Sequence, residues 1–581
     1  MKKFVLVLLT ALAAVPVLCA SSPEHTLFSD GKSSYSIVIP ADASVSETTA
    51  AGELRNYIKG ISGATLPILT GTPAKGPAIY VGYCEKTAKK LKAARPNPLD
   101  ESFTYCSKGD DIYIWGGSEA GTMYGVFSFL EQQFGVRWYS PAFTVVPGLG
   151  SWSFEKLHHS ETPAILRRQT NYYSTSRSPE WNYHNKMNLL WSPVDSKYGH
   201  ISAYWGAHTM GWLVPSKEFF SDHPEYFSEV DGKRISNGQL CLSNPDVLQI
   251  CKDRLLKVIE ENPGYWVYSL SQLDNKKRCT CGRCRALEEE YGGPSGILIW
   301  FVNQVAEEVE KLYPDKYVGT FAYQYTRKAP GKIVPRENVV IRLCDIECCF
   351  AHPLGGCPKN KSFIHDLQEW GKICNNVFIW DYVVNYAQYL APFPNFSVIG
   401  PNVKTFSENN VIGLFEEAQY NSAVAEFPEM RAWMVSKLLW NPEQDTEALA
   451  RDFISGYYGS VAPYIQEYYD MTQDLVKEDT HFNIYIKHDN PLYTDEYVDA
   501  ASKLLSRARI AAANEREKYE VDKVRMQILY LRILRNREQS LEDGTFEEFS
   551  SLVRKTGARI SEVRDFDRFI RDFGYPPYEK K

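Results

Sequence analysis

The chain has 581 residues, of which 44% are hydrophobic and 13% aromatic, and its formal net charge at pH 7 is −7. This length exceeds what one hydrophobic core usually supports, so roughly two to four domains are expected. The net negative charge argues against a nucleic-acid-binding protein. Neutralising phosphates requires a basic face, and the sequence contains no Lys/Arg stripe.

The N-terminus has the pattern of an export signal, residues 1–20. Two lysines precede an apolar run that ends at Leu18, and small residues follow from Ala20. Cleavage after Ala20 is expected, which makes the mature protein periplasmic or extracellular; a lipid anchor on Cys19 is the alternative. No later stretch reaches about eighteen consecutive apolar residues, so no integral membrane span is expected.

Residues 24–155 are predicted to form an α/β domain. Strand-like segments lie at Tyr35–Ile39, Ala78–Gly82 and Asp111–Trp115, and a helical pattern covers Gly121–Phe134. The segments ETTAAGELRNYIKGISGATLPI and GSEAGTMYGVFSFLEQQFGVRWYSP of this domain resemble the N-terminal domain shared by α-glucuronidases and β-hexosaminidase-type enzymes.

The next part of the chain is similar to a bacterial family, domain-of-unknown-function family 4838. The similarity rests on the segments HPEYFSEVDGKR, SLSQLDN, CTCGRC, FVNQVAEEV, FAYQYT and LLWNP. Together the two resemblances imply a glycoside hydrolase-like architecture, in which the N-terminal domain precedes a catalytic barrel.

Residues 160–425 alternate strand-like and helix-like segments, which indicates parallel strands joined by helical crossovers. The candidate strands share β-branched and aromatic residues and are Ile165–Gln169, Tyr265–Leu270, Tyr317–Ala322, Val339–Leu343, Val377–Trp380 and Val411–Phe415. A central TIM-type (β/α)8 barrel is favoured over an open sheet, because the number of candidate strands nearly reaches the count that a barrel needs. No Gly-rich dinucleotide fingerprint follows a strand, which further disfavours a Rossmann fold. Residues 426–581 have a helical pattern and are predicted to form a C-terminal α-helical region. Because the N-terminal domain and the barrel both combine strands with helices, the expected fold class of the chain is α/β.

Carboxylates that directly follow predicted barrel strands are the catalytic candidates, because barrel enzymes place reactive groups at the C-terminal ends of strands. The first two candidates are Asp274 and Glu416, and the next two are Glu347 and Asp381. Glu416 is assigned as general acid and Asp274 as orienting or base carboxylate, or the reverse, since glycosidic cleavage needs two such groups. Only one of Glu416 and Glu417 is expected in the pocket, because adjacent strand residues point apart. A cap, a turn or an arginine partner is the alternative for each.

Polar and aromatic residues near the same strand ends are predicted to bind substrate. Arg168 offers a planar fork for a carboxylate or a pair of hydroxyls, and His208 lies between two tryptophans in WGAHTMGW. The other predicted contacts are Asn275, Tyr323, Trp380 and Tyr382. Packing in a core is the alternative for the aromatic residues.

Two groups of cysteines stand out. Cys279, Cys281 and Cys284 form a CTCGRC cluster, and Cys344, Cys348, Cys349 and Cys357 form the second group. Disulfides or buried thiols are favoured over zinc, because zinc signatures normally show two complete pairs of ligands. Either interpretation makes these cysteines structural, and no cofactor is expected.

The predicted function is an exported glycoside hydrolase that acts on polysaccharide or glycan side chains and is α-glucuronidase-like or N-acetylhexosaminidase-like. Retaining, inverting and substrate-assisted courses all stay open, as do the sugar, the linkage and the oligomeric state. Two alternatives remain: a non-catalytic glycan-binding protein on a barrel scaffold, and a uronate-specific polysaccharide lyase that uses His208, Tyr323 and Arg168.

Overall fold

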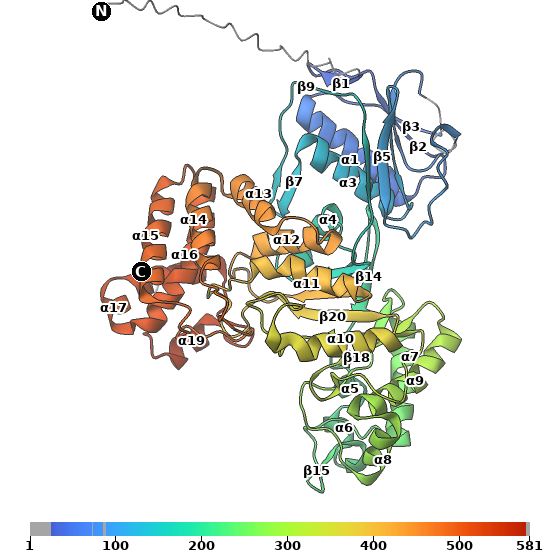
Figure 1. The fold of residues 1–581 in the computed structure, drawn as a ribbon, viewed down its shortest axis with the longest axis vertical. Coiled ribbons are helices and arrows are strands. Elements are labelled where there is room, and N and C mark those ends of the chain that lie inside the picture. Colours follow the sequence, from blue (N-terminus) through green and yellow to red (C-terminus); the bar gives the residue numbers. More distant parts are fainter. Residues whose placement is uncertain (1–24, 72–73, 85–88, 577–581) are drawn as a thin grey trace, which may run out of the picture.

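The computed structural model describes residues 25–71, 74–84 and 89–576, so the expected export signal and the alternative anchor on Cys19 lie outside the described residues. Figure 1 shows an N-terminal domain at the top, a strand-rich centre and a helical region at the left. A lobe projects at the bottom, where α6 (Ser216–Phe219), α8 (Gly282–Tyr291) and β15 (Glu229–Val230) lie.

The N-terminal domain is built on one mixed six-stranded sheet. Its strands follow the order β10 (His158–Glu161), β5 (Phe103–Lys108), β6 (Asp111–Gly116), β4 (Ala78–Val81), β2 (Ser36–Ile39) and β3 (Ile68–Thr70). Helices α1 (Val45–Ser62) and α3 (Gly121–Phe134) pack against each other and share one core with alternate strand residues. The start of α1 is fixed by a capping box between Ser44 and Glu47, and its end by Gly63 at a φ of 80°. Further antiparallel pairs are β1 (His25–Ser29) with β9 (Ser151–Phe154) and β7 (Arg137–Ser140) with β8 (Phe143–Val145).

The centre is a nearly closed barrel of parallel strands, which confirms the predicted TIM-type fold. Paired neighbours follow the order β11 (Arg167–Thr170), β21 (Val411–Glu417), β20 (Val377–Tyr382), β19 (Val339–Cys344), β18 (Tyr317–Ala322), β17 (Val267–Ser269), β14 (Gly199–Trp205) and β12 (Leu189–Leu190). The two edges meet where the Asn188 backbone N–H donates to the Arg168 carbonyl over 3.3 Å. The main helices of this part are α7 (Pro245–Glu261), α9 (Pro294–Leu312), α10 (Lys361–Ile373), α11 (Phe396–Glu408) and α12 (Pro428–Trp440).

All the strands predicted for the barrel are present, each within two residues of its expected ends. Two further strands had no clear signal in the sequence. β12 is only two residues long, and β14 begins at Gly199 as the second arm of a hairpin with β13 (Val194–Ser196).

The lower barrel is a packed core, as expected for this fold. Glycines make room there for large side chains: a Cβ on Gly319 would lie 1.9 Å from the Tyr204 hydroxyl, and a Cβ on Gly413 would lie 2.4 Å from the Phe378 ring. The Tyr204 ring supports the guanidinium of Arg342, which lies 3.7 Å from the ring centroid. Space for a ligand is therefore to be sought at the mouth of the barrel rather than along its axis.

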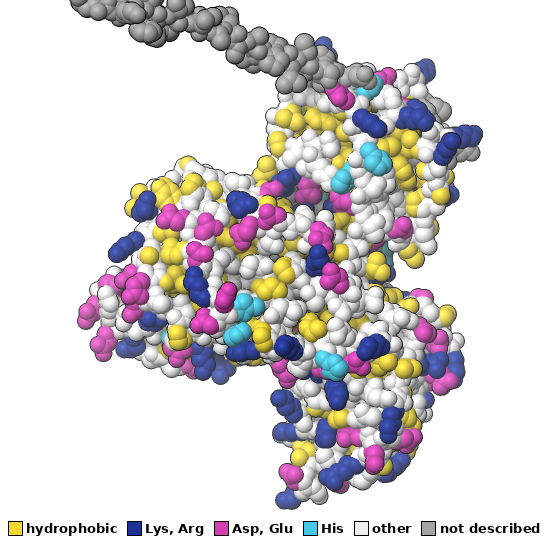
Figure 2. Space-filling model, viewed as in Figure 1, with side chains coloured by type: hydrophobic (Ala, Val, Ile, Leu, Met, Phe, Trp, Pro, Cys, Tyr) yellow, Lys and Arg dark blue, Asp and Glu magenta, His cyan; other side chains and the backbone are white. Residues whose placement is uncertain are grey.

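The helical region follows the barrel in sequence. Its helices are α13 (Thr446–Tyr458), α14 (Ala462–Gln473), α15 (Asp495–Ala511), α16 (Glu515–Arg535), α17 (Arg537–Glu542), α18 (Thr545–Thr556) and α19 (Phe566–Asp572). In α13 to α16, each helix packs against the next one in sequence. None of the helices in the described part of the chain combines the length and apolar character that crossing a bilayer requires. On the face drawn in Figure 2, basic and acidic side chains are interspersed rather than separated into patches.

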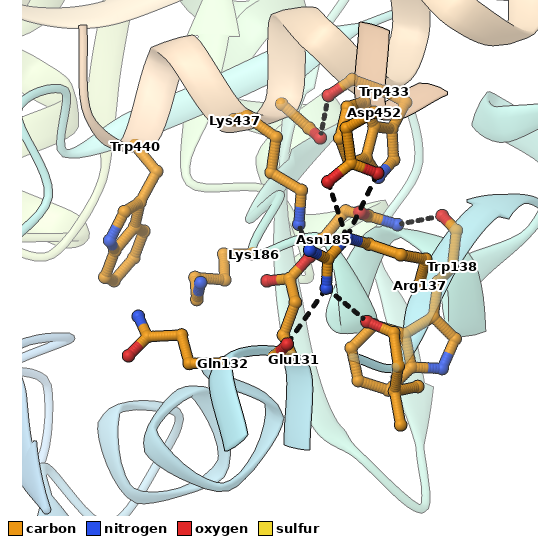
Figure 3. A network of polar contacts seen from close by, with 12 residues as sticks. Glu131, Gln132, Arg137, Trp138, Asn185, Lys186, Trp433, Lys437, Trp440 and Asp452 are labelled. Carbon is orange, nitrogen blue, oxygen red and sulfur yellow. Dashed lines mark hydrogen bonds and ion pairs between the residues drawn. The ribbon is translucent and has the colours of Figure 1, made fainter. Parts of the chain in front are cut away.

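A polar network joins the N-terminal domain to the barrel and the helical region (Figure 3). Lys437 of α12 forms an ion pair with Glu131 of α3, and burial lowers the pKa of the lysine. Arg137 of β7 pairs with Asp452 of α13 over 3.0 Å, and the Trp440 indole donates to a carboxylate of β10 over 2.6 Å. The largely buried Lys437–Glu131 pair holds these parts in one relative orientation, because separating it would leave a buried charge without a partner.

Candidate active site

A pocket of about 880 Å³ opens at the C-terminal ends of the barrel strands. Its walls come from strand ends, from the loops that follow them, and from the helical region. Among the lining residues are Thr170, Asn171, Arg177, Trp191, His208, Asp274, Phe321, Tyr323, Cys344, Trp380, Tyr382, Tyr386, Glu417, Tyr420, Ile484, Tyr485 and Glu562. Aromatic rings with polar tips dominate this set, which suits a ligand that has both apolar faces and hydroxyl groups.

Strand alternation decides which of the predicted residues reach this pocket. Tyr382 of β20 is in register with Glu417 of β21, and Asp381 is in register with Glu416. Successive side chains of a strand point to opposite faces. Trp380, Tyr382 and Glu417 therefore share the inner face and line the pocket, whereas Asp381 and Glu416 point to the outer face.

Glu417 is held against the pocket wall, and its pKa is raised. The Trp380 indole N–H donates to its Oε2 over 2.5 Å, which fixes the carboxyl group against the pocket wall. Burial raises the pKa of Glu417 to about 7. A carboxyl group that keeps its proton near neutral pH is what general acid catalysis requires.

Asp274 lies in the loop after β17, and both its side chain and the loop backbone have hydrogen-bond partners. The Tyr323 hydroxyl donates to Asp274 Oδ1 over 2.9 Å, and the Gln324 amide lies 3.4 Å from the same oxygen. His208 Nδ1 lies 2.7 Å from the Gln272 carbonyl oxygen in the same loop. His208 and Gln324 both have left-handed backbones, with φ of 56° and 52°, a strain that proteins concentrate at functional sites.

Asp274 and Glu417 face each other across the mouth of the barrel. β17 and β21 are separated by β18, β19 and β20 on one side of the eight-strand order, so they occupy opposite sides of the ring. Tyr485 of the helical region is another residue that lines this pocket. Burial raises the pKa of its hydroxyl, and the charges of Asp274, Glu417 and Glu562 raise it further, so all three carboxylates act on one point of the pocket.

The outward-facing acids form a separate buried cluster of Asp345, Asp381 and Glu416. Each is almost or wholly inaccessible to solvent. Burial raises the pKa of Asp381 to about 6, and burial together with the neighbouring carboxyls raises the pKa of Asp345 and of Glu416 well above the usual range. The cluster lies behind the pocket wall, so the structure does not bring Glu416 or Asp381 to the ligand space.

Three other predicted site residues also lie outside the pocket lining. Glu347 is exposed and forms an ion pair with Arg327 over 2.5 Å. Arg168 is fully buried against the N-terminal domain, where it donates to Glu101 over 2.6 Å. Asn275 lies beside Asp274, and its carbonyl accepts a hydrogen bond from the Gln239 amide. By contrast His208, Tyr323, Trp380 and Tyr382 are lining residues, as predicted.

Some lining residues were not predicted from the sequence. Glu417 was set aside in favour of its neighbour, although strand alternation with Trp380 and Tyr382 identifies it. Tyr485 and Glu562 belong to the helical region, where no local pattern distinguishes them from other surface residues.

The fold and the pocket together define a TIM-type barrel protein with an acidic, aromatic-lined site at the C-terminal face. The family model described as Domain of unknown function (DUF4838) matches residues 138–470. The chain therefore belongs to this family, as its sequence segments predict.

Comparison with known proteins adds three similarities, one to a curated sequence and two to solved structures. A stretch of 103 residues, 17% of this chain, is 33% identical to Alpha-glucuronidase A of Emericella nidulans and covers 12% of that protein. The chain thus spans only a small fraction of the length of this curated relative. Among solved structures, a family GH115 4-O-methyl-α-glucuronidase with specificity for decorated arabinogalactans superposes with a TM-score of 0.58 at 13% identity, covering 94% of this chain and 80% of that one. The structure of CpGH84D superposes with a TM-score of 0.49 at 10% identity, covering 94% of this chain and 96% of that one.

Proposed function

We propose that this protein is an exported glycoside hydrolase that removes a sugar from a polysaccharide or glycan side chain. The observation that carries the proposal is the placement of two carboxylates, Asp274 and Glu417, on opposite sides of one aromatic-lined pocket of about 880 Å³. Glycosidic cleavage needs a carboxylic acid and a carboxylate that flank the bond to be broken.

In this proposal Glu417 is the general acid and Asp274 the second carboxylate. Glu417 takes the acid role because burial raises its pKa to about 7, so it still carries a proton at neutral pH. Its proton passes to the glycosidic oxygen as the bond to the anomeric carbon breaks. Asp274, oriented by the Tyr323 hydroxyl, then acts as nucleophile, as base for water, or as the group that orients a substrate acetamide.

An acidic sugar is the substrate class we favour. Arg177 is the only pocket-lining residue in the described chain with a permanent positive charge, and it lies at the exposed rim. Its guanidinium lies over the Tyr173 ring at 4.1 Å from the centroid, and Nη1 donates to the carbonyls of Tyr173 and Tyr420 over 2.8 and 3.3 Å. In this proposal the Nη2 group binds the substrate carboxylate. The GH115 protein that superposes on this chain is a 4-O-methyl-α-glucuronidase, which supports the same class.

The test uses the full mature chain and a panel of aryl glycosides headed by α-glucuronides, together with decorated arabinogalactans and host glycans. We expect Glu417→Gln to lower kcat/KM by about 10²- to 10⁴-fold, the usual contribution of a general acid. Glu416→Gln, the adjacent residue on the outer face, is the matched control and should retain activity. Equal losses in both variants, or none in either, would overturn the assignment.

Two further measurements complete the test. The kcat/KM of the wild type should fall tenfold per pH unit above about pH 7, because Glu417 must be protonated to act. Nuclear magnetic resonance of the freshly released sugar gives its anomer and so distinguishes retention from inversion. A product with an unsaturated bond that absorbs in the ultraviolet would instead identify a lyase, and binding without turnover would identify a glycan-binding protein.

A further inference from the structure

Four cysteines meet in the lobe that projects from the barrel (Figure 1, near α8 and β15). Cys279, Cys281 and Cys284 come from the CTCGRC segment at the start of α8, and Cys241 comes from the loop before α7. All four are buried, and their Sγ atoms lie within 4.8 Å of one another. Cys241, which precedes the CTCGRC segment by a long stretch of chain, supplies the fourth thiol that the sequence pattern lacked.

The spacing of these sulfur atoms suits a metal and not a disulfide. Cys241 Sγ lies 3.8 Å from Cys281 Sγ and 3.7 Å from Cys284 Sγ. Bonded sulfur atoms are about 2.0 Å apart. These four thiols are free and buried, so of the two expected alternatives, disulfides or buried thiols, this cluster has buried thiols. Tetrahedral zinc with Zn–S bonds of about 2.3 Å holds its sulfur ligands about 3.8 Å apart.

The surroundings of the cluster favour thiolates. The Glu229 backbone N–H donates to Cys279 Sγ over 3.3 Å, and the Arg234 guanidinium lies 3.6 Å from the same atom. The Ser243 hydroxyl lies 3.4 Å from Cys241 Sγ. Zinc bound by four thiolates carries a net charge of −2, which donors and a cation of this kind stabilise.

A second group of ligands is made of separate residues. Cys349, His352 and Cys357 come from the loop between β19 and α10, and His481 comes from the segment between α14 and α15. His481 Nδ1 lies 3.2 Å from Cys349 Sγ and 3.8 Å from Cys357 Sγ. His352 Nδ1 lies 4.0 Å from Cys349 Sγ.

The orientation of His352 is that of a metal ligand. Its Nε2 lies 3.1 Å from the Lys477 carbonyl oxygen, so Nε2 carries the proton and Nδ1 is left as a lone-pair donor. Metal-bound histidines usually donate their second N–H to such an acceptor. Two cysteines and two histidines form a common ligand set for structural zinc.

We propose that the protein holds two structural zinc ions, one bound by Cys241, Cys279, Cys281 and Cys284, the other by Cys349, His352, Cys357 and His481. Each ion has four protein ligands and hence no open position for water or substrate. On binding, each thiol gives its proton to solvent and becomes a thiolate, and each histidine binds as the neutral ring.

Both ions fix segments that shape the pocket. In the first site, Gln239 precedes Cys241 and donates to the carbonyls of Leu273 and Asn275, the two neighbours of Asp274, over 2.8 and 2.6 Å. In the second site, His481 lies shortly before Ile484 and Tyr485, which form one pocket wall. One proposed ion thus stabilises the position of a pocket carboxylate, and the other stabilises a pocket wall. The inference goes beyond the proposed hydrolase activity and does not depend on it.

The test measures metal content in the full chain, without any substrate. Inductively coupled plasma mass spectrometry and native mass spectrometry should find two zinc ions per chain in the wild type. Cys241→Ser and Cys349→Ser should each lose one ion, and the double variant should lose both. Cys374→Ala, which removes a buried thiol outside both sites, is the matched control and should keep two.

The wild type alone also tests the proposal in case a variant does not fold. Titrating its thiols with p-mercuribenzoate should release two equivalents of zinc, which a colorimetric chelator detects. X-ray absorption at the zinc edge should show mainly sulfur ligands at about 2.3 Å, with a minority of nitrogen. A folded chain with no metal and a mass lowered by disulfide formation would overturn the proposal. Bound iron would overturn the choice of zinc. If only one ion is found, the site whose thiols are free would be refuted.

Discussion

The buried cluster of Asp345, Asp381 and Glu416 makes the stability of the barrel fall as the pH rises. A carboxyl group whose pKa is raised by folding holds its proton more tightly in the folded chain than in the unfolded one. Its contribution is fully present below the unfolded-state pKa, about 3.9 for aspartate. It is lost as the pH rises through the folded-state pKa, about 6 for Asp381.

The magnitude follows from the same two values. One pKa unit corresponds to about 1.4 kcal/mol, so Asp381 alone contributes about 3 kcal/mol at low pH and nothing above about pH 8. About 1.4 kcal/mol of this is lost between pH 5 and pH 8. Asp381→Asn removes the titration and keeps an oxygen that accepts the Tyr382 backbone N–H, a bond of 2.6 Å in the wild type.

The assay is urea unfolding followed by tryptophan fluorescence at pH 5, 6, 7 and 8. The free energy of unfolding of the wild type should fall by about 1.4 kcal/mol more than that of Asp381→Asn across this range. Asp499→Asn, on the exposed side of α15, is the control and should follow the wild type. A constant gap between wild type and Asp381→Asn, or a gap of opposite slope, would refute the reasoning.

Three other changes have defined outcomes. Glu131→Gln leaves Lys437 buried without its counter-charge and should lower the free energy of unfolding in urea by about 3 kcal/mol; a loss below about 1 kcal/mol contradicts a buried pair. Tyr323→Phe removes the donor to Asp274 and should lower kcat/KM on the substrate found in the screen about tenfold or more; unchanged kinetics would separate this hydroxyl from catalysis. Gly456→Ala places a Cβ 2.1 Å from the Tyr139 hydroxyl and should lower the thermal midpoint, at a cost of about 1–3 kcal/mol; a midpoint equal to that of the wild type would show that the helix can shift.

The barrel could be predicted from the sequence because its buried parallel strands are continuous β-branched and aromatic runs. Val339–Cys344 is an example, since every one of its residues is buried. β12 could not be predicted because two residues carry no periodicity. Its pairing with β14 depends on the tertiary structure. Because both faces of such a strand are buried, its sequence has no polar alternation. The sequence therefore does not reveal which side chains face the barrel axis.

The same ambiguity explains the choice of Glu416. Trp380 and Tyr382 were predicted to face the ligand together with Asp381, yet a period of two cannot place all three on one face. Requiring consistency along β20 excludes Asp381, and the register with β21 then selects Glu417 over Glu416. These two steps need no coordinates beyond the pairing of neighbouring strands.

Other parts of the site were beyond reach of local patterns. Cys241 joins the CTCGRC cluster only through the fold of the lobe, and His481 joins Cys349 and Cys357 across a long separation in sequence. Arg168 was predicted near the C-terminal end of its strand, but it is the second residue of β11 and faces the N-terminal domain, where Glu101 accepts its hydrogen bond. Sequence reasoning identified the residue types correctly and could not supply their partners.

The participation of Tyr485 and Glu562 in the pocket has a consequence for synthesis of the chain. A growing polypeptide can complete every barrel strand by Glu417 and still have a binding site with one side missing. That side is supplied by Tyr485 and Glu562, which follow the last barrel strand in sequence. A chain cut after β21 would therefore keep the barrel strands and lose one wall of the pocket.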